Sequence, residues 1–168
     1  CGLLTGRYQQ RFGVDDNLSG PSYNGLPNSQ RTVPQLMQGL GYRTYGIAKW
    51  HLGNTVNYHP LQRGFDAWYG INSGGRSYWN TTGEDDQFQD NEVLRPEDEG
   101  DYVTDRVGNA CTNFIARHLA LYGTNQPFFI YAAFTAVHAP MDIDTPPAPK
   151  PADPRYARLW NEFGLTNS

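Results

Sequence analysis

The sequence has few of the features that mark several large protein classes. Only two cysteines occur among its 168 residues, Cys1 and Cys111, and so sparse a pair says nothing about the redox compartment. No run approaches the roughly eighteen apolar residues of a membrane-spanning helix, so no membrane span is expected. The net charge is −4 and no basic stripe alternates with aromatics, which argues against a nucleic-acid partner.

Apolar and turn-forming residues are arranged in the alternation typical of an α/β domain. Thr32 is a candidate N-cap with Pro34 in the first helical turn, and Gly41 is expected to end this helix in a left-handed conformation. A strand over residues 42–48 follows. The expected buried stripe of the helix consists of Leu36, Met37 and Leu40.

A second helix and strand are expected further along the chain. Apolar residues recur at helical spacing from 102 to 119, and Cys111 on this face is interpreted as a buried, inert thiol. The continuous apolar run 127–134 suits a central parallel strand covered on both faces. Because a helix is twice followed by a buried strand, the sequence predicts an α/β fold with a mostly parallel sheet.

Two stretches lack such a pattern. Residues 54–100 are interpreted as an irregular insertion, since nine of the seventeen acidic residues fall between Glu84 and Asp101. A solvated loop is favoured over a metal loop, because these carboxylates lack the fixed spacing of a calcium site. Residues 146–168 are Pro-rich, so the expected division is a domain over 1–145 followed by a tail.

Three side chains suited to binding an anion follow the two expected strands. Lys49 and His51 come directly after residue 48, and His138 comes shortly after the 127–134 run. Lys49 and His51 share a face in an extended backbone. The carboxyl ends of parallel strands meet at one rim of a sheet, where ligands bind in open α/β folds. An amine and imidazoles gathered there would receive a negatively charged oxygen.

Four short motifs carry a resemblance to a known family. In chain order they are Cys1-Gly2-Leu3-Leu4-Thr5-Gly6-Arg7, Ala48-Lys49-Trp50-His51-Leu52-Gly53, Arg63-Gly64-Phe65-Asp66 and His138-Ala139-Pro140. Together they resemble type I sulfatases, the formylglycine-dependent arylsulfatase-like enzymes, over residues 1 to about 142. By the same resemblance, Thr5 and Gly6 are the tail of the family's Cys-x-Pro-Ser-Arg signature. The chain is therefore expected to start just after the catalytic motif and to hydrolyse no aryl sulfate alone.

The resemblance implies a partial three-layer, alkaline-phosphatase-like α/β sandwich that hydrolyses sulfate esters. In its terms Lys49 binds and polarises the sulfate, while His138 contacts it and protonates the leaving oxygen. His51 orients the hydrated formylglycine. Intact family members use formylglycine and calcium, but no residue of this chain is assigned as a metal ligand. A secreted, periplasmic or lysosomal location is also implied.

The substrate class rests on weaker signals. Sulfated carbohydrate is preferred to a simple aryl sulfate, because aromatics make up 14% of the chain and Arg76 with its aromatic neighbours suits a sugar site. Arg76 is therefore a candidate substrate-binding residue beside Lys49 and His138. Two alternatives stay open: a phosphonate or phosphate ester hydrolase of the same superfamily, and a non-catalytic anion-binding protein that has lost its nucleophile.

Several other positions receive a structural interpretation. Ala48 replaces the glycine that the family has before Lys49, a change expected to be tolerated unless the position needs a positive φ. Arg63 and Asp66 are interpreted as a surface pair. His59 is expected to face solvent from a loop, and His118 to be a cation favoured by the end of its helix.

Overall fold

A central parallel strand, β1 (Arg43–Lys49), organises the structure. The computed structural model describes residues 1–18, 25–53, 55–76, 78, 88–91, 93–95 and 102–136. Within them a five-stranded sheet has the order β4-β3-β2-β1-β5. Its other strands are β2 (Ala67–Ile71), β3 (Gln89–Asp90), β4 (Val93–Leu94) and β5 (Phe128–Ala133).

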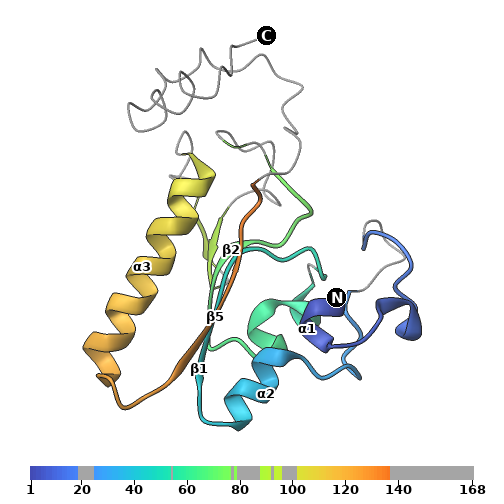
Figure 1. Cartoon of the computed structure of the whole chain (residues 1–168). Helices are drawn as coiled ribbons and strands as arrows, with labels where there is room; N and C mark the ends of the chain where they lie inside the picture. Colours follow the sequence, from blue (N-terminus) through green and yellow to red (C-terminus); the bar gives the residue numbers. More distant parts are fainter. Residues whose placement is uncertain are drawn as a thin grey trace, which may run out of the picture.

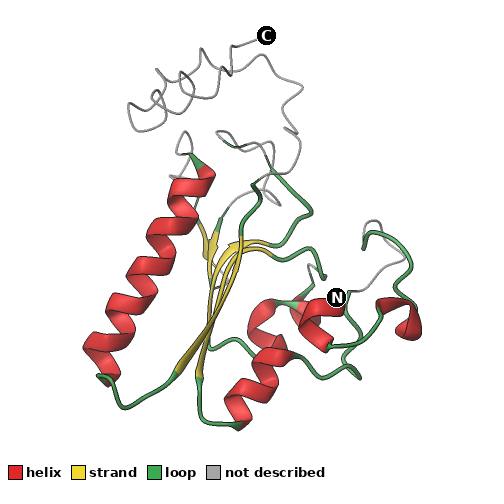
Figure 2. Cartoon of the chain, viewed as in Figure 1, coloured by secondary structure: helices red, strands yellow, loops and turns green. Residues whose placement is uncertain are grey.

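The sheet is mostly parallel and has helices on both faces. β2 and β5 run parallel to β1 on either side of it, while β3 pairs antiparallel with β2 and β4 with β3. The long helix α3 (Val103–Tyr122) covers one face, and α1 (Gly2–Thr5) and α2 (Val33–Gly39) lie on the other (Figures 1 and 2). The expected three-layer α/β fold is therefore confirmed. Short 3₁₀ turns occupy Gln9–Phe12, Val56–Tyr58 and Pro60–Arg63.

The start of α2 has the cap that the sequence predicts. The Thr32 side chain accepts the Gln35 backbone N–H at 3.4 Å, and the Gln35 side chain accepts the Thr32 backbone N–H at 3.0 Å. Pro34 lies in the first turn, where its missing N–H has no helical partner to lose. Gly41 follows the helix with a φ of 85°, the left-handed conformation expected of it.

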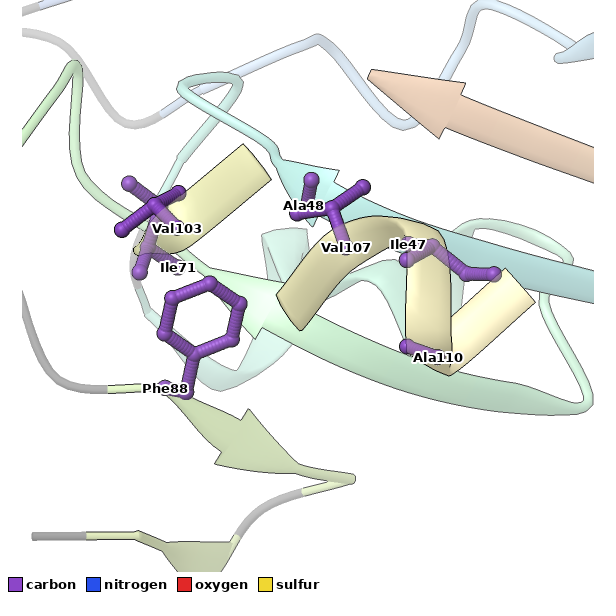
Figure 3. Packing of buried hydrophobic residues seen from close by; sticks show 7 residues of the cluster. All are labelled: Ile47, Ala48, Ile71, Phe88, Val103, Val107 and Ala110. Atoms are coloured by element: carbon purple, nitrogen blue, oxygen red, sulfur yellow. The ribbon is translucent and has the colours of Figure 1, made fainter. Parts of the chain in front are cut away.

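One core lies between the sheet and α3. The buried side chains there come from β1, β2, α3 and the segment before β3, and Figure 3 shows them meeting across the helix–sheet interface. Cys111 and Phe114 pack against this cluster from the predicted helical face. Burial raises the pKa of the Cys111 thiol, which disfavours the reactive thiolate. The cluster consists of Ile47, Ala48, Ile71, Phe88, Val103, Val107 and Ala110.

A second core, dominated by aromatics, lies on the opposite face of the sheet. The Trp50 ring meets Phe65 and Trp68 edge-on, with centroid distances of 6.0 and 6.1 Å. Gly46 of β1 makes room for this packing, because a Cβ there would lie 2.7 Å from the Trp68 ring. Leu4, Leu26 and Leu52 complete the cluster.

The expected buried stripe of α2 is wrong. Leu36 is 43% exposed and Leu40 is 71% exposed, whereas Pro34 is the buried residue of the helix. The reason is that a hydrogen bond at the amino end of this short helix, rather than an apolar stripe, holds it to the rest of the protein. Thr32, fully buried, donates its hydroxyl to the Arg63 carbonyl at 2.7 Å and so fixes which side of α2 faces inward.

The expectation of an irregular segment over 54–100 is wrong for β2, β3 and β4, of which β2 is the longest. Residues 67–71 form a strand beside β1, and Trp68 and Ile71 bury their side chains on opposite faces of the sheet. The acidic composition of the segment's second half hid these apolar positions. Most of that acidic stretch, residues 84–87 and 97–101, lies outside the described residues. The division at residue 145 stays a prediction.

The 127–134 run forms β5, but not as the central strand expected. Among the described residues β5 pairs with β1 alone and lies at the edge of the sheet. Phe128 is 36% exposed there. An apolar run indicates burial against a helix layer but not how many strands flank it, so its place in the sheet could not be predicted. No helix in the described part of the chain is long and apolar enough to cross a membrane.

Candidate active site

The candidate site lies where β1 ends. Lys49 is the last residue of the strand, and the chain continues beside β2, where the Trp50 N–H donates to the Ile71 carbonyl at 2.9 Å. The His51 N–H donates to the Asn72 carbonyl at 3.2 Å. Lys49 and His51 therefore stand at the carboxyl ends of parallel strands, the rim where α/β folds bind ligands.

Ala48, the residue before Lys49 in β1, has an unusual backbone conformation. Its φ is 81°, which glycine adopts freely and which costs other residues about 1–3 kcal/mol. Alanine was expected to be tolerated here only if φ was not positive, and that condition is not met. The Ala48 carbonyl oxygen lies so close to Gly70 that a side chain there would overlap it.

Trp50 anchors the segment between the two candidate residues. Its side chain is 3% exposed, packs in the aromatic core and donates from Nε1 to the Tyr58 carbonyl at 2.9 Å. Lys49 and His51 are only half-buried on either side of it. The buried indole thus fixes the backbone from which both polar side chains extend.

Electrostatics disfavour the cationic forms of both residues. Burial lowers the pKa of Lys49. Burial, and secondarily the positive charge of Lys49, lower the pKa of His51. An anion placed between them would stabilise both charges, and a neutral imidazole is at the same time ready to accept a proton. A cleft of about 570 Å³ borders His51, and the segment from Val14 to Leu18 lines its other side.

The loop after β2 belongs to this site, and sequence reasoning missed it. Besides accepting the His51 N–H, the loop places Gly74 against the His51 ring. Asn72 is 8% exposed and donates from Nδ2 to Gln89 Oε1 at 3.1 Å. An apolar strand at 67–71 followed by Asn-Ser-Gly-Gly was the signal that could have placed a loop at the same rim.

Arg76 lies in the core. It is 4% exposed, and its guanidinium carbon stands 5.2 Å from the centre of the Phe88 ring. Arg106 of α3 approaches the same ring at 4.8 Å. The two arginines thus join the loop after β2 to α3 through one phenylalanine. A role for Arg76 in substrate binding stays a prediction.

Three other polar residues are buried, and two of them, His59 and Arg63, were expected at the surface. His59 is 4% exposed; its Nδ1 accepts the Leu61 N–H, and its Nε2 lies 3.3 Å from Gln89 Oε1. Arg63 is 2% exposed and donates to loop acceptors at 27–30. His118 is 1% exposed and bonded at both ring nitrogens. Each finds partners distant in sequence, which local patterns do not reveal.

His138, the third residue of the expected site, lies outside the described residues. Within the described ranges, no group of three or more His, Cys, Asp or Glu residues is placed to hold a metal ion.

The chain is similar to known proteins over most of its length. The family model described as Sulfatase matches residues 2–162. The sulfatase YdeN of Escherichia coli is 29% identical over 98% of this chain and 30% of its own length, and human arylsulfatase G is 30% identical over 97% and 36%. The crystal structure of Ps i-CgsB has a TM-score of 0.73 at 29% identity, covering 83% of this chain and 34% of that protein. This chain thus spans about a third of the length of these relatives.

Proposed function

This chain belongs to the sulfatase family, and we propose that its site is the sulfate-binding rim of a sulfuric ester hydrolase, centred on Lys49 and His51. The observation that carries the proposal is the burial of these two side chains together with the lowered pKa of each. Two basic side chains are half-buried at the carboxyl end of β1, and burial lowers the pKa of each. The cationic forms of such a pair are stabilised most by a ligand that carries negative charge on several oxygens.

The residues divide the chemistry of sulfate ester cleavage among them. Lys49 donates to the sulfuryl oxygens, where preorganised donors are worth several kcal/mol of barrier. His51 orients the attacking group, as the neutral imidazole favoured by its lowered pKa. His138, outside the described residues, protonates the leaving oxygen. The family resemblance adds formylglycine and calcium, but no described group fits a metal ion, and no step here runs through one.

We propose sulfated carbohydrate, rather than a simple aryl sulfate, as the substrate class. One structural relative at 29% identity was crystallised in complex with k-i-k-neocarrahexaose. Another, at 28% identity and a TM-score of 0.62, was crystallised with D-glucosamine-2-N,6-O-disulfate. Pig N-acetylgalactosamine-6-sulfatase is 31% identical over 83% of this chain. A secreted, periplasmic or lysosomal location stays a prediction from the family resemblance.

The proposal is tested with inorganic sulfate and the protein's own histidine signals. Sulfate bound at this site stabilises the imidazolium, so it should raise the pKa of His51, followed by NMR titration with and without sulfate. Lys49→Ala should remove most of this response. Arg117→Ala, which also removes one positive charge but from the exposed surface of α3, should leave it unchanged. A His51 titration indifferent to sulfate would contradict the proposal, and a response to methylphosphonate but not to sulfate would favour a phosphonate ester hydrolase.

A further inference from the structure

The imidazole of His51 occupies space left by a glycine in the neighbouring loop. A methyl carbon placed on Gly74 would lie 2.6 Å from Cε1, 2.7 Å from Nε2 and 2.9 Å from Nδ1 of His51. All three distances are shorter than carbon and nitrogen atoms tolerate without a bond. Since the overlap involves most of the ring rather than one flexible end, the ring as a whole would have to move.

The backbone at Gly74 does not itself call for glycine. Gly74 is absent from the residues with positive φ, whereas Gly64 and Gly123, for example, have φ values of 95° and 65°. Alanine can therefore adopt the backbone conformation at 74, and what it cannot do is share the space of the His51 ring. A side chain is excluded at this position because the imidazole of His51 occupies the space.

The same loop also fixes the backbone of His51. The Asn72 carbonyl accepts the His51 N–H at 3.2 Å, and His51 has a left-handed φ of 52°. Asn72 is held by its own side chain, which donates to Gln89 Oε1, the oxygen that also faces Nε2 of the buried His59. His51 is thus held by the loop at its backbone and flanked by it at its ring.

We propose that Gly74 is a positioning residue for His51, and that the open space at 74 determines where the imidazole lies beside Lys49. The consequence for sulfate binding rests on the function proposed above. The effect of Gly74 on the position of the imidazole does not depend on that function.

The first test is the titration of His51 by NMR in the full chain, with signals assigned through a His51→Ala variant. Gly74→Ala should displace the ring away from residue 74 and so change both its burial and its distance from Lys49. Because these are the two causes of its lowered pKa, the His51 pKa and the ring chemical shifts should both change. Gly108→Ala is the matched control, because a methyl group there meets nothing within 4 Å. A His51 pKa and ring chemical shifts unchanged by Gly74→Ala would overturn the proposal.

A double-mutant cycle separates positioning from general packing. Gly74→Ala should lower Tm by about 5 °C in the otherwise unchanged protein, but by much less in the His51→Ala background, where the obstructing ring is gone. Equal losses in the two backgrounds would overturn the proposal. If Gly74→Ala alone does not fold, the double variant decides: a folded double variant supports the proposal and an unfolded one overturns it.

Inorganic sulfate distinguishes this inference from the proposed function. If both hold, Gly74→Ala should weaken sulfate binding by about tenfold, a modest loss for a displaced binding group. If the unaltered protein binds no sulfate while the cycle shows coupling between positions 51 and 74, the positioning role is supported and the sulfatase site is not. If sulfate binds equally well in both proteins and His51 titrates identically, the positioning role is overturned.

Discussion

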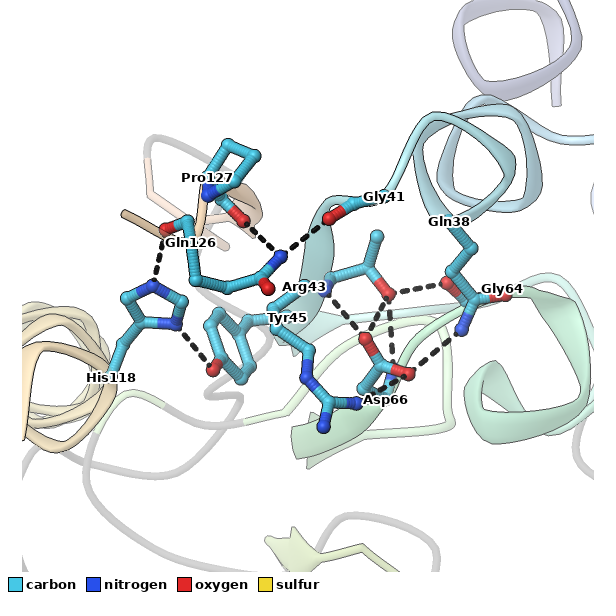
Figure 4. Close-up of polar contacts among 10 residues, drawn as sticks. Gln38, Gly41, Arg43, Tyr45, Gly64, Asp66, His118, Gln126 and Pro127 are labelled. Carbon is cyan, nitrogen blue, oxygen red and sulfur yellow. Dashed lines mark hydrogen bonds and ion pairs between the residues drawn. The ribbon is translucent and has the colours of Figure 1, made fainter. Parts of the chain in front are cut away.

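The hydroxyl of Tyr45 is hydrogen-bonded to Nδ1 of His118 across 2.9 Å and so joins the central strand to α3 (Figure 4). The other ring nitrogen is bonded as well. Nε2 donates to the Gln126 carbonyl at 2.8 Å, because a carbonyl only accepts. His118 is therefore a buried residue of the core, bonded at both ring nitrogens, although the sequence suggested only a cation at the end of its helix.

Tyr45→Phe should destabilise the protein although it removes a single oxygen. It leaves the buried Nδ1 of His118 without its hydrogen-bond partner, which costs about 1–3 kcal/mol of unfolding free energy. Denaturant unfolding measures the loss. Combining Tyr45→Phe with His118→Phe should cost less than the sum of the single changes, since the bond is lost only once. Strict additivity would show that the pair is not coupled.

Ala48→Gly should destabilise the protein less than the same change at Ala110, or should stabilise it. Relief of the positive φ is worth about 1–3 kcal/mol, and it opposes the loss of one buried methyl group and the added freedom of the unfolded chain, together about 1–2 kcal/mol. Ala110→Gly, in α3, has only the unfavourable contributions and should destabilise by about 1–2 kcal/mol. Chemical unfolding of the two variants compares them, and equal losses would mean that residue 48 carries no strain.

Lys49→Met should move the His51 pKa part of the way back to its ordinary value of 6.5. The variant removes the repulsion from Lys49 but leaves burial, the larger cause, in place. The folded protein with a lowered His51 pKa binds fewer protons than the unfolded chain, so its stability falls as the pH drops below 6.5 toward that lowered pKa. Lys49→Met should reduce this slope, measured as Tm against pH, and Arg117→Met should not.

Arg63→Met should be strongly destabilising. The guanidinium donates to Asn28 Oδ1 at 2.8 Å and to the Gln30 carbonyl at 2.8 Å, and methionine leaves these acceptors without partners. We expect a loss of about 2–4 kcal/mol in unfolding free energy. Arg11→Met, at an exposed arginine, should change stability by no more than about 0.5 kcal/mol. A small loss at Arg63 would show that the 27–30 loop reorganises without it.

Local patterns predicted those elements whose signals are local. The N-cap at Thr32, the strand expected over residues 42–48 and the helical face of α3 each depend on residues a few positions apart, and the structure has all three, with the strand at Arg43–Lys49. The strand's end also placed Lys49 at the carboxyl rim of the sheet. Their catalytic roles, and that of His138, stay predictions.

What the sequence did not reveal depends on contacts between distant segments. His59 and His118 are buried because Gln89 and Tyr45, 30 and 73 residues away, bond to them. The positive φ of Ala48 could be stated only as a condition, because it rested on the glycine that the family resemblance puts at this position. β2 was missed because its apolar residues are embedded in a segment whose charge suggested solvent.

The turn that leads from α3 into β5 has a fixed number of residues. Arg43 N–H donates to the Pro127 carbonyl, which sets Arg43 opposite Phe128 and every later pair along the two strands. Side chains alternate along a strand, so a single residue inserted or deleted between 123 and 127 would exchange the two faces of β5. Tyr131, now against Phe65, would turn toward α3, and Ile130 would take its place. This turn can therefore change its composition during evolution far more readily than its length.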